Sequence, residues 1–172
     1  MEATQDLLWE QGYSATSPKD IMRRSGAGQG SMYHHFTNKQ ELAVVALECS
    51  AQSMRHDAEK LLATDGSAYE IATAYLRRQR DVLKGCRMGR MTFDADVLNT
   101  PELIEPVKRT FVWLLEALTV LFERGKDQGE FAADIDARNL ASLVVATVQG
   151  GYVLARATRD TDAFDAAVEG AA

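Results

Sequence analysis

The chain of 172 residues carries a formal net charge of −6, with 46% hydrophobic and 26% charged residues. These values are ordinary for a globular protein of one or two domains. No apolar run approaches the roughly 20 residues that span a bilayer, and no signal peptide begins the chain. The two cysteines, Cys49 and Cys86, form neither a metal-ligand cluster nor a disulfide framework, which indicates a reducing cytoplasm. Only three prolines, with Ala, Leu, Glu and Arg abundant, predict an all-α fold.

The charge is unevenly placed along the chain. Residues 12–40 hold four basic residues and one acidic residue, a formal charge of +3, whereas residues 41–172 hold the whole net charge of −6. A small basic segment on an acidic body suits a protein that touches DNA through one end.

Two helices are expected before residue 26. Residues 1–11 have a helical pattern, and Gly12 is a natural stop. Ser17 is expected to cap the second helix, with Pro18 at its first position and Asp20 three residues after the cap.

A glycine-containing turn after Ser25-Gly26 leads into a third helix over residues 29–36. This stretch is partly aromatic and carries polar side chains where a buried helix would carry leucines. Two short helices joined by such a turn form a helix-turn-helix, whose second helix lies in the major groove of DNA.

The rest of the chain reads as a series of longer helices. A capping box over residues 37–40 begins a helix of roughly 25 residues, which ends near residues 64–66. Further helices are expected over residues 67–84, over residues 86–98, from about Pro101 to the glycines at 125–129, from Asp134 or Asp136 to about Thr158, and over residues 160–170.

The N-terminal residues resemble the signature of TetR-type transcriptional regulators. The resemblance covers about residues 3–45 and rests on Gly12-Tyr13, Thr16-Ser17, Asp20-Ile21, Gly26, Gly30, Met32–Phe36 and Lys39–Leu42. Residues 85–172 resemble the C-terminal domains of that family more loosely. The resemblance implies a helix-turn-helix DNA-binding domain at residues 1–42, N-terminally short, and a helical ligand-binding and dimerisation domain at residues 43–172. Such proteins are mostly homodimeric, ligand-responsive repressors that dimerise through the last two helices.

Seven residues are predicted to contact operator DNA: Ser17, Gln29, Gly30, Ser31, Tyr33, His34 and Lys39. Gly30 lets the helix approach the sugar-phosphate backbone closely. Three of the seven, Ser17, Tyr33 and Lys39, suit phosphate contacts. Gln29, Ser31 and His34 are then left to read base edges. Phe36, Met32 and Ile21 are expected to pack inside the head.

Two further sites are predicted in the body. An adaptable apolar pocket for a small-molecule effector is expected among Tyr75, Met88, Met91, Phe93, Phe111 and Trp113, although any one of these is readily a core residue. A dimer interface is expected on one face of the helix ending near Thr158, at Leu140, Val144, Thr147, Val148, Gly151, Tyr152 and Ala155. Packing within one chain is the alternative for that face.

Other functions fit the residues less well. The glycines at 26–30 lack the rest of a nucleotide-binding fingerprint, adjacent His34 and His35 lack further ligands for a metal, and no nucleophile motif indicates an enzyme or a cofactor. Cys86, beside Lys84 and Arg87, is either a reactive sensor thiol or a small packed residue.

The interpretation is therefore a cytoplasmic, homodimeric repressor that a small, largely apolar molecule releases from a near-palindromic operator on double-stranded DNA. The alternative is a helical sensor or interaction protein with a degenerate DNA-binding head, since Gln29 stands where the family commonly has lysine.

Overall fold

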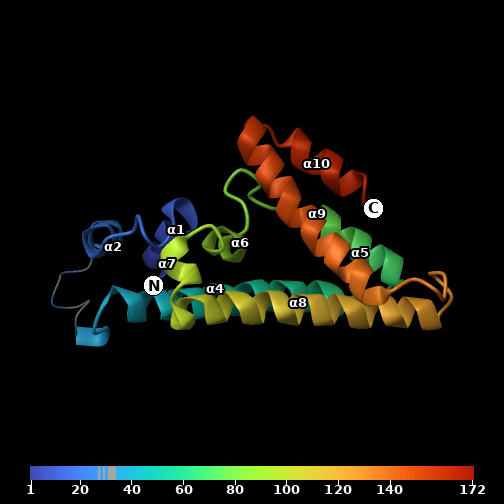
Figure 1. The fold of residues 1–172 in the computed structure, drawn as a ribbon, viewed down its shortest axis with the longest axis horizontal. Helices are drawn as coiled ribbons and strands as arrows, with labels where there is room; N and C mark the ends of the chain where they lie inside the picture. Colours follow the sequence, from blue (N-terminus) through green and yellow to red (C-terminus); the bar gives the residue numbers. More distant parts are fainter. Residues whose placement is uncertain (27, 29, 31–33) are drawn as a thin grey trace. The chain divides into compact units, whose positions relative to one another are not determined.

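The computed structural model describes residues 1–172 except residues 27, 29 and 31–33. Every regular element in the described residues is a helix, which confirms the predicted all-α class (Figure 1). The helices are α1 Glu2–Gln11, α2 Pro18–Ser25, α4 Lys39–Leu62, α5 Ala68–Arg77, α6 Arg87–Met91, α7 Ala95–Leu98, α8 Pro101–Asp127, α9 Ala137–Thr158 and α10 Asp162–Glu169.

The chain packs as two compact units. One comprises Met1–Met54 with Cys86–Thr110, and the other comprises Arg55–Gly85 with Phe111–Ala172. Packing therefore does not divide the chain at residue 42, because the segment around α6 and α7 packs with the N-terminal helices. The long helices α4 and α8 contribute residues to both units.

The N-terminal helices of the first unit share a small apolar core. Leu7 of α1, Ile21 of α2 and Leu42 of α4 are buried together, and Met22 and Phe36 pack against them. This confirms that Ile21 and Phe36 pack inside the head.

Helix α2 begins and ends as predicted. The Ser17 hydroxyl accepts a hydrogen bond from the Asp20 N–H, and the Asp20 carboxylate accepts one from the Ser17 N–H at 3.1 Å, which completes a capping box. Pro18 occupies the first helical position. Gly26 ends the helix with a φ of 68°, in the left-handed region that glycine enters at little cost.

Helix α4 begins one residue later than the predicted capping box implies. The Asn38 side-chain oxygen accepts from the Glu41 N–H at 2.9 Å, and the Glu41 carboxylate accepts from the Thr37 N–H at 2.7 Å. Asn38 therefore takes the capping place, because its short amide reaches the free N–H groups of the first turn. The helix ends at Leu62, close to the expected break.

A single helix over residues 86–98 was the wrong prediction. The chain forms two short helices, α6 and α7, and leaves the helical path between Met91 and Ala95. The Asp94 carboxylate accepts from the N–H groups of Asp96 and Val97 and so caps α7. Aspartate competes with a continuous helix in this way because its side chain offers the backbone a local acceptor.

Helix α5 is shorter than the predicted span of residues 67–84. It ends at Arg77, and residues 78–85 have no helical structure. The Arg80 guanidinium donates to three backbone carbonyls of residues 75–78, at 2.5–2.8 Å. These carbonyls would otherwise lack partners at a helix end, so Arg80 caps α5 where the sequence indicated more helix.

Helix α8 passes through Gly125 and ends at Asp127, within the predicted stretch of residues 125–129. Gly125 is helical and lies against Ala68 of α5 and the ring of Phe131. Gly129 follows with a φ of 76° and makes the turn that Gly125 does not.

Helices α9 and α10 complete the second unit and lie side by side (Figure 1). Asp136 caps α9, which decides between the two predicted starts. The ring of Phe164 on α10 packs on Gly151 and Tyr152 of α9. By length and composition alone α9 is apolar enough to cross a membrane, contrary to the prediction that no run approaches this, and 33% of its most apolar window is buried.

Candidate nucleic-acid interface

The helical segment after the turn is exposed where the structure describes it. Gly30, His34 and His35 are helical and exposed, and the two imidazole rings stack with centroids 5.0 Å apart. A Cβ added at Gly30 would meet nothing within 4 Å. Packing within the described chain therefore does not require glycine there, and its close approach to DNA remains a prediction.

The other predicted contacts of this helix, Gln29, Ser31 and Tyr33, lie outside the described residues, as does Met32. Their roles in reading bases, contacting phosphate and packing remain predictions. Ser17 is described: its hydroxyl is engaged in the cap of α2. Its contact with a phosphate remains a prediction.

The positive charge of the head is partly paired within the head. Arg23 pairs with Asp20 at 2.7 Å, and Arg24 pairs with Glu10 at 2.8 Å. Lys19, at the second position of α2, is exposed and forms no ion pair with the described residues. Surface ion pairs of this kind contribute little to stability, so breaking either one to let the arginine pair with a phosphate would cost little. Lys19 is not among the seven predicted contacts, although its place beside the N-cap was a usable signal.

Lys39 has a structural partner that the sequence did not reveal. Its ammonium donates to the Tyr13 carbonyl at 2.9 Å and lies 3.9 Å from the centroid of the Tyr13 ring. Burial lowers the pKa of Lys39, while the charges of Asp94 and Asp96 oppose that change. Lys39 therefore ties the start of α4 to the loop after α1, and its phosphate contact remains a prediction.

Two polar contacts attach the α6–α7 segment to the head. The Ser14 N–H and hydroxyl donate to the Asp94 carboxylate at 2.8 and 2.6 Å, and the hydroxyl also donates to Asp96 at 2.8 Å. Burial raises the pKa of Asp94, but hydrogen bonds from Ser14 and from the α7 backbone together bring it below its ordinary value. Some 80 positions separate these partners, and nothing in the local sequence indicates their pairing.

The second contact lies at the start of α6. The Arg87 guanidinium donates to Asp6 of α1 at 3.1 Å and lies 4.1 Å from the ring centroid of Trp9. Neighbouring Cys86 caps α6, with its sulfur accepting from the Gly89 N–H at 3.2 Å. The thiol thus has a local structural role.

The six predicted pocket residues divide between the units. Tyr75, Phe111 and Trp113 belong to the second unit, and Met88, Met91 and Phe93 belong to the first. Tyr75 and both methionines are buried, and Phe111 and Trp113 are half-buried. Phe93 is 78% exposed. That exposure corrects its placement in the wall of an enclosed pocket, because α6 ends at Met91 and the chain turns Phe93 outward.

The predicted dimer face of α9 lies inside the chain. Five of its seven residues are buried within the second unit and two are half-buried: Val144, Val148, Gly151, Tyr152 and Ala155, then Leu140 and Thr147. Phe164 of α10 covers the part of this face at Gly151 and Tyr152. The assignment is corrected: packing within one chain, the alternative reading, accounts for these residues.

The opposite side of α9 carries a second apolar stripe, which is exposed. We call it the outer stripe of α9; it comprises Leu143, Ala146, Gly150, Val153, Leu154 and Ala157. Leu143, Val153 and Leu154 are each more than half exposed. The spacing by three and four residues puts them on one helical face.

Two family models match this chain, one at each end. The family described as bacterial regulatory proteins, tetR family, matches residues 1–46, and the Tetracyclin repressor-like C-terminal domain matches residues 66–171. An uncharacterized HTH-type transcriptional regulator of Bacillus subtilis (strain 168), YxaF, is 24% identical over 161 residues, which cover 90% of this chain and 81% of that protein.

Solved structures share the fold. A TetR transcriptional regulator from Chloroflexus aurantiacus J-10-FL is 28% identical, with a TM-score of 0.88 over 98% of this chain and 88% of that one. A cysteine mutant of the TetR family regulator CifR, complexed with 26 bp double-strand operator DNA, is 21% identical, with a TM-score of 0.82 over 99% of this chain and 92% of that one. With the helix-turn-helix at its N-terminus and a C-terminal family match over more than half its length, the chain belongs to the TetR family of transcriptional regulators, which bind DNA and are not enzymes.

Proposed function

We propose that this regulator is a cytoplasmic homodimer that represses transcription from a near-palindromic operator and is released by a small, largely apolar molecule. The observation that carries the proposal is the head. A capped α2 leads through left-handed Gly26 into a helical segment whose described histidines are exposed rather than packed. That is the arrangement a recognition helix needs to enter the major groove.

The head divides its residues between positioning and reading. Ser17, Tyr33 and Lys39 are assigned to phosphates, and Gly30 to close approach of the backbone. Gln29, Ser31 and His34 are assigned to base edges, where glutamine can pair with adenine in two places. Lys19 is also assigned to phosphates, because it is exposed at the N-terminus of α2.

Binding to the upstream DNA of its own operon, followed by fluorescence anisotropy over a salt series, tests this division. Tyr33→Phe and Lys39→Ala should weaken binding to all sequences, and Lys39→Ala should also lower the salt slope by about 1. Gln29→Ala should change sequence preference. Lys60→Ala is the matched control, since Lys60 is an exposed lysine in the last turn of α4, outside the head.

Two results would contradict the proposal. Full-length protein that shows no salt-sensitive binding would favour a sensor or interaction protein with a degenerate head. A uniform loss with Gln29→Ala would remove its base-reading role. Thermal unfolding of Lys39→Ala must accompany the titration, because Lys39 also holds the Tyr13 carbonyl.

The proposed dimer uses the outer stripe of α9. An apolar face of this kind on a helix whose opposite face is already core needs a covering partner, and family membership points to a second copy. Ala146 and Gly150 let two helices approach closely. A dimer places its recognition helices about one DNA turn apart, roughly 34 Å, which is why the operator should be near-palindromic.

Leu143→Asp tests that surface by light scattering after size exclusion. The charge should split the dimer, because a buried unpaired carboxylate is costly. Leu98→Asp is the control, since Leu98 is a comparably exposed leucine in the other unit, at 51% against 56% for Leu143. A Leu143→Asp protein that remains dimeric would exclude the outer stripe as the interface.

The proposed effector is apolar because each unit offers methionine or aromatic side chains away from solvent: buried Met88 and Met91 in the first unit, and buried Tyr75 with half-buried Phe111 and Trp113 in the second. Methionine adapts readily to an inserted ligand. Such a ligand releases DNA only to the extent that it binds the DNA-free state more tightly, and operator DNA must weaken ligand binding by the same factor.

A further inference from the structure

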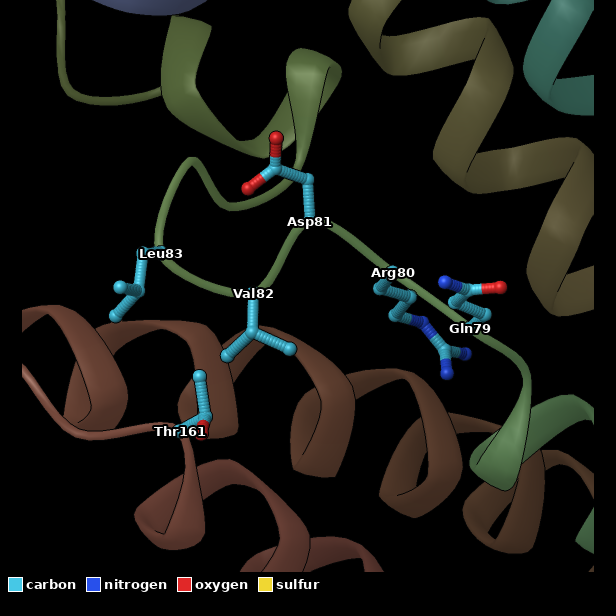
Figure 2. A pocket seen from close by; sticks show the side chains of 6 residues that line it. All are labelled: Gln79, Arg80, Asp81, Val82, Leu83 and Thr161. Carbon is cyan, nitrogen blue, oxygen red and sulfur yellow. The ribbon is translucent and has the colours of Figure 1, made fainter.

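Two adjoining cavities lie in the second unit beside the segment after α5. One, of about 640 Å³, is lined by Gln79–Leu83 and Thr161 (Figure 2). The other, of about 350 Å³, extends from the end of α5 to α10. They share Gln79, Arg80 and Val82, so together they form one recess, which we call the Arg80 recess.

The guanidinium of Arg80 is held in place by hydrogen bonds and aromatic rings. Its two Nη atoms donate to the carbonyls of Tyr75, Leu76 and Arg78, and its guanidinium lies 5.4 and 5.6 Å from the ring centroids of Tyr75 and Phe164. Its Nε is buried and has no acceptor among the described residues. Burial accordingly lowers the pKa of Arg80.

Arg78 repeats this pattern beside it. Its guanidinium lies 4.8 Å from the Tyr75 ring centroid, and its buried Nε also lacks an acceptor in the part of the chain that the structure describes. The charge of Arg78 further lowers the pKa of Arg80. Two guanidinium groups therefore lie over one aromatic ring, and their like charges interact.

The nearby acids do not neutralise this pair. Glu169 is engaged by Arg77 through two hydrogen bonds of 2.6 and 2.8 Å, and Asp81 pairs with Lys84 at 3.7 Å. Asp165 lines the smaller cavity but forms no ion pair with any described residue. Within the described chain, neither Arg78 nor Arg80 has a carboxylate partner.

Paired guanidinium groups without a counter-ion in a recess are what an oxyanion ligand requires. Partly buried cations are costly unless charge and hydrogen bonds compensate them, and arginine donors match carboxylate and phosphate oxygens. Apolar surface lies in the same recess: Leu76, Val82, Leu83, Phe164 and Val168. We propose that the Arg80 recess binds a small organic oxyanion, with its carboxylate or phosphate group at Arg78 and Arg80 and its apolar body against Val82 and Phe164.

This site lies outside the head, and none of the predicted effector-pocket residues lines it, although Arg78 and Arg80 contact the ring of Tyr75. Its occupancy therefore does not depend on DNA binding. Ligand binding at the recess is measured on the DNA-free protein, so a failed operator titration would not count against this site.

Isothermal titration of the full chain at constant ionic strength, with hexanoate, hexyl phosphate and inorganic phosphate as probes, tests the site. Hexanoate or hexyl phosphate should bind saturably, one per chain, and inorganic phosphate more weakly because it lacks the apolar body. Whichever alkyl probe binds more tightly identifies the carboxylate or the phosphate as the preferred group. Arg78→Gln should weaken binding about tenfold, since it removes charged hydrogen bonds.

Arg55→Gln is the matched control, because Arg55 lies over the Trp113 ring at the same 4.8 Å, in the same unit but outside the recess. It should leave affinity unchanged. Val82→Glu, which puts a carboxylate into the recess, should abolish binding and decides the matter if Arg78→Gln does not fold. No saturable binding of any probe, or undiminished binding by the folded variants, overturns the proposal.

Discussion

Gly125 should be intolerant of the smallest possible side chain, although it stands inside a helix. A Cβ at this position would lie 2.6 and 2.8 Å from the Phe131 ring and 2.7 Å from the Ala68 Cβ. Optimal carbon contacts are about 3.5–4.0 Å. Ala68 cannot yield easily, because it is fully buried at the first position of α5.

Two opposing contributions decide whether Gly125→Ala raises or lowers the free energy of unfolding. Helix propensity alone would make Gly125→Ala more stable by about 1 kcal/mol, whereas overpacking costs about 1–3 kcal/mol. With two elements in the way we expect the upper part of the overpacking range, about 2–3 kcal/mol, and so a net loss of about 1–2 kcal/mol. For a chain of this size that lowers Tm by about 2–8 °C.

Urea and thermal unfolding by circular dichroism at one fixed protein concentration measure the change, since dimerisation makes Tm depend on concentration. Phe131→Leu in the Gly125→Ala background should recover part of the loss, while alone it should destabilise by removing the edge contact with Phe122. A variant as stable as the parent or more stable would refute the close packing of α5, α8 and Phe131.

Three further predictions follow from single contacts. Ser17→Ala removes the cap of α2 and should cost about 1 kcal/mol in unfolding free energy, measured by urea titration. In the folded protein the pKa of Asp94 lies below its ordinary value, so the stabilisation by its carboxylate is present above about pH 4 and lost on acidification. Asp94→Asn should therefore reduce the loss of stability between about pH 5 and 3. An unchanged dependence of stability on acid pH would contradict this. Lys39→Met frees the Tyr13 carbonyl and should cost about 1 kcal/mol, detectable as a lower urea midpoint; no change would mean that water replaces the ammonium.

The local signals of the helices could be read from the sequence. Ser17-Pro18 and the aspartate three residues later mark the start of α2, and a glycine in the left-handed region marks its end. Each depends on partners within about four residues, which is why the pattern suffices. The positions of the later helices followed from similar signals, apart from α5 and the split between α6 and α7.

Those exceptions have a common cause. The end of α5 depends on Arg80, whose side chain folds back onto the last carbonyls of that helix. The break before α7 depends on Asp94, whose carboxylate also accepts a hydrogen bond from the distant Ser14 hydroxyl. A residue that competes with a helix through its side chain looks, in sequence, like any polar residue in a helix.

The sequence by itself determined the all-α class, the helix-turn-helix and the family, because these rest on short-range capping, turn and motif patterns. Tertiary structure alone decided which face of α9 is core, that Phe93 is exposed, and that Ser14 meets Asp94. α9 is apolar on both sides, so periodicity could not say which side α10 would cover. Such choices are made by contacts between segments far apart in the chain, and a one-dimensional pattern does not record them.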